Sequence, residues 1–408
     1  MNGITLLCKV VDNYGDAGVV YRLARALSAL PDCPPLGIII DDARALAQLA
    51  PGIVAGQAVQ TYECTADSGC AGVTWRIYDW NAGKVCAPLF KHEMPDILLE
   101  CFQCGRPDWL DGLLFAPGAA FTTSIVNIDY LTAESYAEDF HCLQSLTRSA
   151  RIRKVNFMPG FTAKTGGLIL DAPFMSRVGN RAAAFDALAA YGLHDDGSFI
   201  VPVFTYERDF TPLVTALTVL NESAPGGKHI AVYLAPGRSC KPFLTAWCLA
   251  GRPFRVMELP FMSQTAWDAL LCAADFSFIR GEDSFARACL AGAPFVWHAY
   301  VQDEEYQLVK VQALLDRMRP YFASELFETL QELFLLYNRT YADGGAACST
   351  QLARQSELLV SLFAAYDRLR QGYAAFAADL RGNGDLASHL LAYVRERFCG
   401  GNKDVQGC

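Results

Sequence analysis

Residues 1–40 alternate strand-like and helix-like segments, and this alternation constrains the fold more than any other feature of the sequence. Residues 4–11 (ITLLCKVV) form a short apolar run, which predicts a buried strand. A polar turn, DNYGDAG, follows, and residues 19–30 then place leucines on one face of a helix. Residues 36–40 are apolar again. Because a strand–helix–strand unit joins parallel strands, the chain is expected to open with a parallel α/β sheet.

The same alternation recurs in two series along the chain. In the first series, further strands are predicted at 96–102, 124–131 and 154–161. In the second series, strands are predicted at 199–206, 229–236, 254–261, 275–281 and 294–300. A polar and alanine-rich passage, residues 172–198, separates the two series, and residues 304–398 follow a helical pattern.

Two domains fit this order and the length of 408 residues, since a domain takes about 150 residues. We expect an N-terminal Rossmann-like domain over residues 1–180, completed by helices at 372–398, and a C-terminal Rossmann-like domain over residues 190–370. Domains of this kind bind ligands at the carboxyl ends of their strands. Dehydrogenases, kinases, periplasmic binding proteins and glycosyltransferases share such an arrangement, so the fold alone leaves the chemistry open.

Composition and charge exclude several classes of protein. Hydrophobic residues make up 52% of the chain and charged residues 19%, which differs from the composition of disordered chains. The net charge of −9 speaks against a general nucleic-acid binder. No apolar run reaches the length of about 18 residues that a membrane span requires. The N-terminus lacks the pattern of a signal peptide, and we therefore expect a cytoplasmic protein without membrane association.

Fifteen cysteines are scattered through apolar runs, which predicts reduced core thiols. Cys101 and Cys104 are spaced like one half of a zinc ribbon, but no second pair follows them, and we interpret them as packing residues. No Asp-x-Asp pair follows a predicted strand, and the six histidines show neither ligand nor triad spacing. The sequence therefore predicts a protein that works without a metal or cofactor.

The loop after the first predicted strand carries two carboxylates, Asp12 and Asp16, at the start of a helix. Helix N-termini favour negative charge, and in the simpler interpretation Asp16 caps the helix while Asp12 closes a turn. The functional alternative is a general base, or a pair of carboxylates that orients a cationic acceptor. Asn13, Tyr14 and Gly15 lie between the two aspartates and are candidate substrate contacts.

A second loop, Arg280 to Ser284, lies between a predicted strand and a helix. An arginine, a glycine and a helix N-terminus in this order are typical of an anion site, because the guanidinium and backbone N–H groups can face a phosphate or diphosphate. The simpler alternative is that Asp283 or Ser284 is an ordinary N-cap. Glu282 would repel a diphosphate unless it faces sugar hydroxyls, which favours a nucleotide sugar as the ligand.

Neither a dinucleotide fingerprint nor a P-loop accompanies these loops, since G-x-G-x-x-G and G-x-x-x-x-G-K-[ST] are absent. Aromatic residues recur at strand ends in the second series. Phe204 is assigned to the core by default but stays a candidate contact, and Tyr206 is placed to stack on a base. The sequence predicts a metal-free diphosphate site, neutralised by Arg280 and a helix dipole.

Several segments together resemble the bacterial protein-arginine rhamnosyltransferases (the EarP family), which modify translation elongation factor P. The similar segments are VVDNYGDAGVVYRLAR, DILLECF, VNIDYLTAE, FMPGFTAKTGG, LPFMSQTAWDALLCAADFSFIRGEDSFARACLAGAPFVWHAYVQDE and LVKVQALL. They span roughly residues 4 to 315 in the family's order, and the combination of DNYGDAG, RGEDSFARA and PFVWH is specific. Residues 60–92 have no counterpart in the resemblance, and the helical C-terminal part is too variable to contribute.

The resemblance implies a GT-B glycosyltransferase fold, an α/β fold of two Rossmann-like domains facing across a cleft, with a helical C-terminal segment. It also implies an inverting transfer of L-rhamnose from dTDP-β-L-rhamnose to an arginine of elongation factor P. Asp12 and Asp16 match the family's essential acidic residues, and Glu282 is counted with them as a catalytic candidate. The donor site is matched by Arg280, Glu282, Asp283 and Ser284 at the diphosphate and sugar, and by Tyr206, Phe261 and Gln264 on the nucleotide side.

An arginine acceptor poses a chemical problem, because the pKa of its guanidinium lies above about 12. Two carboxylates can hold the guanidinium, aim one nitrogen at the anomeric carbon and accept the proton as the C–N bond forms. We assign Asp16 as the base and Asp12 as the orienting partner. Two alternatives stay open: a GT-B transferase that uses another nucleotide sugar, and a non-catalytic nucleotide-sugar-binding protein that docks a protein partner. The second needs Arg280 and Ser284 but neither aspartate.

Overall fold

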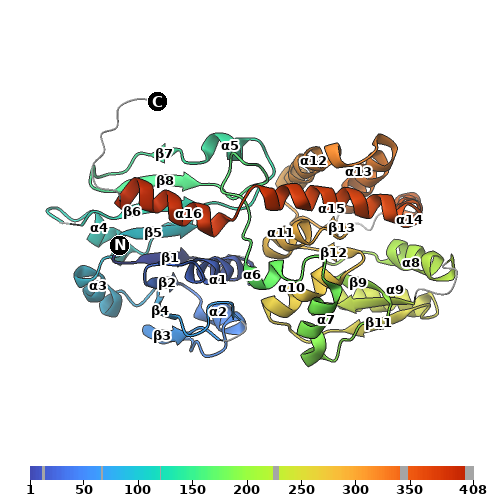
Figure 1. Cartoon of the computed structure of the whole chain (residues 1–408), viewed down its shortest axis with the longest axis horizontal. Coiled ribbons are helices and arrows are strands. Elements are labelled where there is room, and N and C mark those ends of the chain that lie inside the picture. The colour runs from blue at the N-terminus through green and yellow to red at the C-terminus, as the bar shows by residue number, and fades with distance from the viewer. Residues whose placement is uncertain (12–13, 66–67, 120, 224–228, 341–347, 400–408) are drawn as a thin grey trace. The chain divides into compact units, whose positions relative to one another are not determined.

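The computed structural model describes residues 1–11, 14–65, 68–119, 121–223, 229–340 and 348–399. The chain divides into two compact units, each with its own sheet (Figure 1). Unit 1 comprises Met1–Ala172 and Asn383–Cys408, and unit 2 comprises Pro173–Gly382. The chain thus leaves unit 1 once and returns to it for its C-terminal residues.

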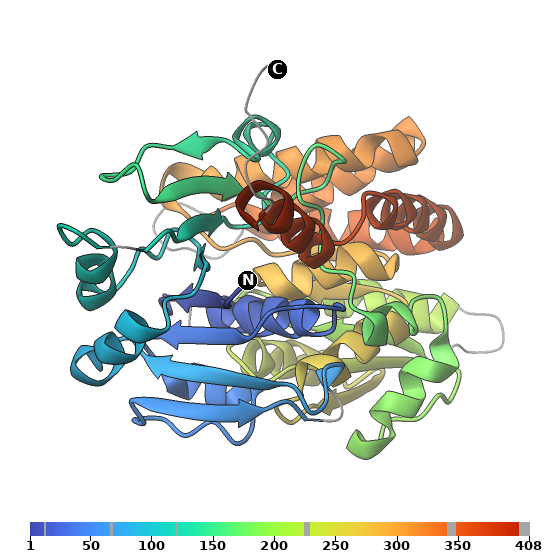
Figure 2. The same cartoon turned by 60° about the vertical axis from the view of Figure 1, so that its left-hand side comes forward.

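Unit 1 contains, within its described residues, a sheet in the order β3-β4-β2-β1-β5-β6-β8-β7. Its strands are β1 Ile4–Cys8, β2 Leu36–Ile40, β3 Val59–Glu63, β4 Thr74–Asp79, β5 Ile97–Cys101, β6 Ser124–Ile128, β7 Gln144–Ser145 and β8 Arg153–Phe157. β3 pairs with β4, and β7 with β8, in the antiparallel sense, whereas the central strands are parallel. Figure 2 shows the blue and teal strands of this sheet side by side. The four central strands are buried at every position, as parallel strands covered on both faces are.

Two apolar cores cover the two faces of this sheet. The helices of unit 1 are α1 Gly15–Ser28, α2 Ala43–Leu49, α3 Gly83–His92, α4 Asp108–Leu114, α5 Tyr136–Phe140 and α16 Leu386–Val394, which continues into the π-helical turn η6 Arg395–Cys399. Leu6 and Cys8 of β1 enter a core with α1, α2 and α16, whereas Leu7 enters a core with α3 and α4. This alternation follows from the two-residue period of a strand.

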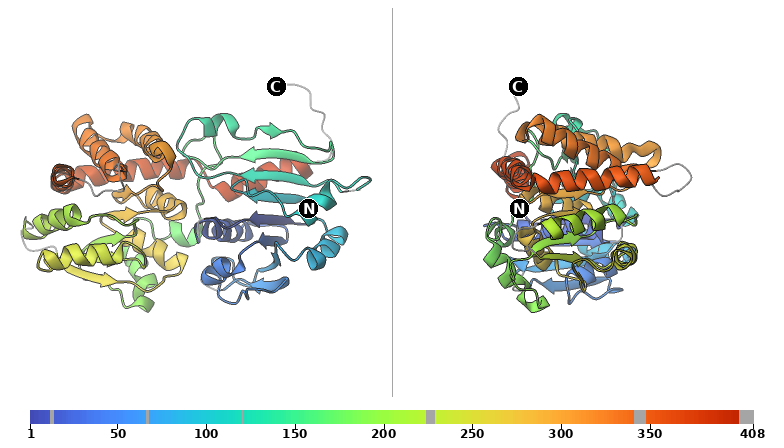
Figure 3. Two further views of the ribbon diagram at one scale, coloured as in Figure 1. Left: turned by 180° about the vertical axis from the view of Figure 1, so that it is seen from behind. Right: turned by 90° about the vertical axis from the view of Figure 1, so that its right-hand side faces the viewer.

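The C-terminal helix α16 belongs to the core of unit 1. It buries Leu386, Leu390 and Val394 among residues of β1, β2 and α1. Tyr393 lies with its ring 5.6 Å from the ring of Phe157 on β8. Figure 3 shows this helix, in red, behind the green strand β8 when the chain is viewed from the back.

Unit 2 contains, within its described residues, a parallel sheet in the order β11-β10-β9-β12-β13. Its strands are β9 Phe199–Val203, β10 Ile230–Leu234, β11 Arg255–Glu258, β12 Ser277–Ile279 and β13 Phe295–Trp297. The helices are α6 Ala172–Met175, which starts at the unit boundary, α7 Arg181–Leu188, α8 Thr211–Ser223, α9 Cys240–Leu249, α10 Gln264–Ala273, α11 Glu282–Ala291, α12 Tyr306–Met318, α13 Ser324–Asn338, α14 Ser349–Ala364 and α15 Tyr366–Gly382. Short 3-10 turns lie at Ala189–Tyr191, Asp303–Glu305 and Arg319–Tyr321.

Helices cover both faces of the sheet in unit 2. Ile200 of β9 lies in a core with α7 and α10. The preceding residue, Phe199, points to the other face, where its ring lies 6.3 Å from the ring of Phe363 on α14. β9 is therefore buried on both sides, in agreement with its uninterrupted apolar sequence.

The predicted parallel α/β architecture is confirmed, and each predicted strand-like run contains a strand of the structure. Most strands end a few residues before the apolar run does, because the last residues of the run enter the loops at the carboxyl ends. The predictions missed β3, β4 and β7. β3 has one buried position in five and β4 three in six, so neither forms an uninterrupted apolar run, and β7 is only two residues long. Among the described residues, no helix combines the length and the hydropathy that a membrane crossing requires.

Candidate active site

Each unit has a topological switch point, where ligands of doubly wound sheets bind. In unit 1, β1 lies between β2 and β5, and the chain adds strands first on the β2 side and then on the β5 side. In unit 2, β9 lies in the same way between β10 and β12. The loop predicted around Asp16 follows β1, and the loop from Arg280 to Ser284 follows β12. Both predicted loops therefore start at switch points.

Asp16 is the second residue of α1 and is almost fully buried, with 3% of its side chain surface exposed. Its Oδ2 accepts a hydrogen bond of 2.8 Å from the backbone N–H of Val11, just after β1. Its Oδ1 accepts one of 3.3 Å from the hydroxyl of Tyr130, just after β6. The N-cap of α1 is Tyr14, whose side chain makes no capping hydrogen bond. Asp16 is therefore not the N-cap of this helix, and its carboxylate links two strand ends.

The structure describes some of the other predicted residues of this loop and not others. Asp12 and Asn13 lie outside the described residues. Tyr14 is 49% exposed, and its carbonyl accepts a hydrogen bond of 2.8 Å from the N–H of Gly18. Gly15 is half-buried and opens α1. The described part of the loop thus places Asp16 inward and Tyr14 outward at one helix end.

Two aromatic residues that the sequence interpretation did not assign complete the surroundings of Asp16. Tyr130 stacks on Phe102, with ring centroids 4.5 Å apart and an interplanar angle of 21°. Phe102 directly follows β5, the neighbour of β1 in the sheet. Both residues stand in segments quoted for the family resemblance, DILLECF and VNIDYLTAE, but nothing in their spacing marks them as neighbours of Asp16, which precedes Phe102 by 86 positions and Tyr130 by 114.

Cys101 and Cys104 are free thiols next to this site. Cys101 is buried, and Cys104 donates to the carbonyl of Leu7 at 3.4 Å. Burial raises the pKa of the Cys104 thiol to about 12, and burial likewise raises the pKa of Cys8 and Cys101. These thiols are therefore protonated near neutral pH, as packing residues are.

In unit 2, the structure brings Arg280, Phe204 and Tyr206 together. The guanidinium carbon of Arg280 lies 4.7 Å from the ring centroid of Phe204 and 4.5 Å from that of Tyr206. Nε of Arg280 is buried and has no hydrogen-bond partner within the described residues. A Cβ built on Gly237, in the loop after β10, would lie 4.0 Å from an Nη atom of Arg280. Two aromatic faces therefore hold the guanidinium in place at the carboxyl ends of the strands.

The N-terminus of α11 carries the other candidates of this loop. Its N-cap is Gly281, with φ 77° and ψ 152°, and no side chain caps it. Asp283 accepts from Nε2 of Gln264 at 3.1 Å, and Ser284 accepts from the indole N–H of Trp267 at 3.0 Å. The alternative in which Asp283 or Ser284 is the N-cap is therefore wrong. Both lie inside the first turn, and Glu282, half-buried, is its first residue.

The remaining aromatic candidates lie around α10. The ring of Phe204 is 5.6 Å from that of Trp267 on α10, so Phe204 packs at the site rather than deep in the core. Phe261 lies on the segment before α10 and is 49% exposed. Trp267 links Phe204 to Ser284, and the sequence interpretation missed it because its spacing on α10 reads as ordinary packing.

His298, after β13, is a further residue that was interpreted as an ordinary buried histidine. It is 7% exposed, and its ring lies 5.1 Å from that of Tyr206 and 5.2 Å from that of Tyr337. Burial, together with the positive charges of Arg208 and Arg280, lowers the pKa of His298 well below its ordinary value. The imidazole is therefore neutral and adds no second charge behind Arg280.

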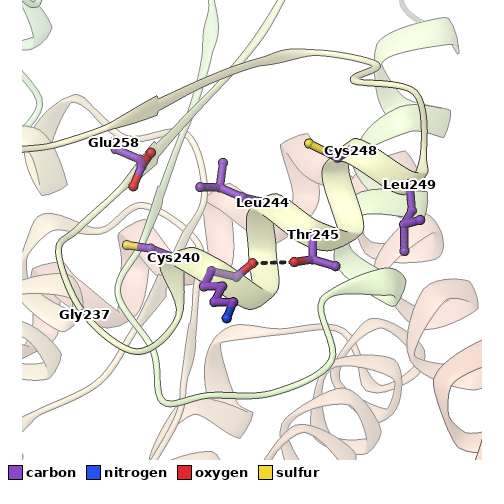
Figure 4. A pocket seen from close by; sticks show the side chains of 8 residues that line it. Gly237, Cys240, Leu244, Thr245, Cys248, Leu249 and Glu258 are labelled. Carbon is purple, nitrogen blue, oxygen red and sulfur yellow. Dashed lines mark hydrogen bonds between the residues drawn. The ribbon is translucent and has the colours of Figure 1, made fainter.

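A separate open cavity of 530 Å³ lies along α9 and the end of β11 (Figure 4). It is lined by Gly237, Cys240, Lys241, Leu244, Thr245, Cys248, Leu249 and Glu258. None of the predicted site residues lines it, and only Gly237 links its rim to Arg280. Among the described residues, no group of three His, Cys, Asp or Glu side chains is placed to hold a metal ion.

Two Rossmann-like units, each a largely parallel sheet with helices on both faces, are the elements of the GT-B glycosyltransferase fold. The fold agrees with that of a solved structure described as the structural basis for EarP-mediated arginine glycosylation of translation elongation factor EF-P. The two chains match with a TM-score of 0.56 and 22% sequence identity, over 96% of this chain and 98% of the other. The expected GT-B fold class is thus confirmed.

Sequence comparison defines the family. The profile of a family described as elongation factor P rhamnosyltransferase EarP matches residues 4–395. A protein-arginine rhamnosyltransferase of Pseudomonas putida is 31% identical over 96% of this chain and 98% of its own length. The corresponding protein of Shewanella oneidensis is 28% identical over 96% of this chain and 97% of its own. The chain belongs to the EarP family, and it is an enzyme of the glycosyltransferase class.

Proposed function

We propose that the chain transfers L-rhamnose, with inversion at the anomeric carbon, from dTDP-β-L-rhamnose to an arginine side chain of translation elongation factor P. Membership of the EarP family supports this reaction, and so does the activity for which the Pseudomonas putida relative is named. The observation that carries the proposal is the buried carboxylate of Asp16 at the switch point of unit 1, which does not serve as a helix cap.

The acceptor half of the proposed reaction takes place at Asp16. A guanidinium nitrogen of the acceptor attacks the anomeric carbon, the bond from that carbon to the diphosphate breaks, and dTDP leaves with the bonding electrons. The proton of the attacking nitrogen passes to Asp16. Two hydrogen bonds already fix the orientation of its carboxylate, so little reorganisation is needed when the cation arrives. Asp12 is proposed as the second carboxylate that orients the guanidinium, with Asn13, Tyr14 and Gly15 as neighbouring contacts.

The donor half is proposed to take place at the switch point of unit 2. The diphosphate is neutralised by Arg280 and by the N-terminus of α11, whose first N–H groups point away from the helix. Glu282 faces the sugar hydroxyls, and Tyr206, Phe204, Phe261 and Gln264 take the nucleotide side. Asp283 and Ser284 position Gln264 and Trp267 through the hydrogen bonds described above.

This donor site is proposed to work without a metal ion or cofactor. One guanidinium and one helix N-terminus supply the positive charge that the leaving diphosphate requires. The enzyme is proposed to act in the cytoplasm.

The test is the intact mass of elongation factor P after incubation with the enzyme and dTDP-β-L-rhamnose. The proposal predicts a gain of one deoxyhexose, and no gain when the acceptor arginine is replaced by lysine. A parallel reaction with a UDP-sugar distinguishes the alternative transferase. If the enzyme binds dTDP but modifies no protein under these conditions, the proposal is wrong and a non-catalytic binding protein is favoured.

A further inference from the structure

A small set of residues at the carboxyl ends of β5 and β6 contacts Asp16 through Tyr130 and is not accounted for by the proposed reaction. We call it the Asp129 corner, and it consists of Phe102, Gln103, Asp129 and Tyr130. All four lie in unit 1, just after the two strands that follow β1 across the switch point.

The Asp129 corner is fixed by two hydrogen bonds to the carboxylate of Asp129 and by one backbone hydrogen bond that extends the pairing of β5 with β6. Oδ2 of Asp129 accepts from the side-chain amide of Gln103 at 2.8 Å, and its Oδ1 accepts from the backbone N–H of Tyr130 at 2.8 Å. The backbone N–H of Phe102 donates to the carbonyl of Ile128 at 2.7 Å. One carboxylate thus ties the end of β5 to the end of β6.

The backbone conformation of Phe102 and Gln103 also indicates that surrounding contacts hold the Asp129 corner in place. Phe102 and Gln103 have φ angles of 59° and 54°, in the left-handed region that residues other than glycine rarely adopt. Two consecutive residues in this region need surrounding contacts to hold them, and such conformations cluster at functional sites. In this backbone conformation, the ring of Phe102 stacks on the ring of Tyr130.

The stacked ring determines where the hydroxyl of Tyr130 lies. With Phe102 covering one face of the ring and the backbone held by Asp129, the phenol reaches Oδ1 of Asp16 at 3.3 Å. Val11 holds the other oxygen, Oδ2, at 2.8 Å. The carboxylate is therefore held at both oxygens and cannot rotate freely, and Tyr130 contributes a contact from outside the β1–α1 loop.

We propose that Tyr130 is a positioning residue for Asp16, held in place by the Asp129 corner. The phenol fixes the plane of the carboxylate, and with it the direction from which the carboxylate accepts the proton that leaves the acceptor nitrogen. This inference rests on the proposed catalytic role of Asp16. Tyr130 itself neither exchanges a proton nor contacts the reacting atoms.

The experiment compares Tyr130→Phe with the wild-type enzyme at saturating donor and acceptor. The substitution keeps the ring and its stacking and removes only the hydroxyl. We expect kcat to fall about tenfold, the scale of one hydrogen bond to a charged group, while the KM values for donor and acceptor stay within about twofold. Tyr321→Phe is the matched control, because its hydroxyl donates to the carboxylate of Asp379 at 2.7 Å in unit 2 and its loss is expected to leave the rate unchanged.

A double-mutant cycle separates positioning from a general structural role. If Tyr130 acts through Asp16, Tyr130→Phe costs nothing further in the Asp16→Asn background. Phe102→Leu, which removes the stacking partner and keeps the hydroxyl, is expected to lower kcat by less than Tyr130→Phe does. Additive losses in the cycle would show that the hydroxyl acts elsewhere and would overturn the inference. A raised acceptor KM with unchanged kcat would also overturn it, since Tyr130 would then be a binding contact.

The same data distinguish this inference from the proposed function. A wild-type enzyme that modifies elongation factor P, an impaired Asp16→Asn variant and a fully active Tyr130→Phe variant would overturn only the role of Tyr130. A wild-type enzyme that transfers no sugar would overturn the proposed function, and the positioning role with it.

Discussion

The candidate sites of the two units lie at equivalent places in their sheets but carry opposite charges. In unit 1, a carboxylate is held by a strand-end N–H and a tyrosine hydroxyl, so hydrogen bonds fix an anion. In unit 2, aromatic faces and a helix N-terminus surround a guanidinium, so stacking fixes a cation. The same Rossmann-like scaffold therefore supports two kinds of chemistry, and the residues after the strands determine which.

This difference matches the two proposed substrates. A guanidinium acceptor needs negative charge and a proton acceptor, whereas a leaving diphosphate needs positive charge and N–H donors. Acceptor chemistry is therefore proposed for unit 1 and donor binding for unit 2, and substitutions in the two sites are expected to have separable effects.

The largest effect is expected for Asp16→Asn. The asparagine keeps the shape, its carbonyl oxygen can still accept from the N–H of Val11 and its amide can donate to the hydroxyl of Tyr130, but it cannot take the proton. The value of kcat is expected to fall by about two or more orders of magnitude, the scale for removing a general base, with little change in melting temperature. Single-turnover rates and thermal unfolding measure the two quantities.

Asp42→Asn is the control for Asp16→Asn. Asp42 is a true N-cap, since it accepts from the N–H of Arg44 at the start of α2. Asparagine is a good N-cap, so both the rate and the stability of this variant are expected to stay close to wild type. Equal rates for the two variants would remove Asp16 from the chemistry.

Arg280→Ala is expected to weaken dTDP binding by roughly 1.5–3 kcal/mol, the range for a charge-assisted hydrogen bond. Calorimetric titration of dTDP gives the affinity. Arg319→Ala is the matched control, because Arg319 also lies over an aromatic ring, that of Phe327, at 4.5 Å. An unchanged affinity in Arg280→Ala would exclude this arginine from the donor site.

The buried His298 predicts a pH dependence of stability. Its pKa is lowered in the folded protein, so the folded state stays neutral while the unfolded state binds a proton as the pH falls below about 6.5. The free energy of unfolding should therefore decrease with falling pH in that range, by up to about 1.4 kcal/mol per pH unit from this group. His298→Phe is expected to flatten the slope in denaturant titrations, and replacement of the exposed His92 is not. An unchanged slope in His298→Phe would contradict the neutral, buried imidazole.

The smallest effect is expected for chelation. With Arg280 and the α11 N-terminus as the positive groups, turnover in EDTA should equal turnover in magnesium. Initial rates of elongation factor P modification, measured in EDTA and in magnesium, test this expectation. Loss of activity in EDTA that magnesium restores would show that a metal ion stabilises the leaving diphosphate.

The sequence was sufficient to predict the features that depend on neighbouring residues. Apolar runs located the parallel strands other than β4, whose exposed and buried positions alternate, and the loops after β1 and β12 were identified as the candidate sites. β3 escaped prediction because the edge of the sheet leaves it half-exposed, so its sequence lacks the apolar run of a central strand.

The side-chain partners of the candidate residues could not be predicted in the same way. Tyr130 meets Asp16 across 114 positions of the chain, and only the pairing of β5 and β6 beside β1 brings them together. Side-chain partners at the N-terminus of α11 could not be predicted for the same reason. Asp283 and Ser284 have the residue types of N-caps, but Gln264 and Trp267 of the neighbouring α10 engage them, and Gly281 takes the cap position.

The division of roles between the two units is tested most directly by titrating dTDP into Asp16→Asn. The account predicts an affinity within about threefold of wild type in the same variant whose rate has fallen by orders of magnitude. A loss of dTDP affinity as large as that of Arg280→Ala would contradict it, because Asp16 would then belong to donor binding.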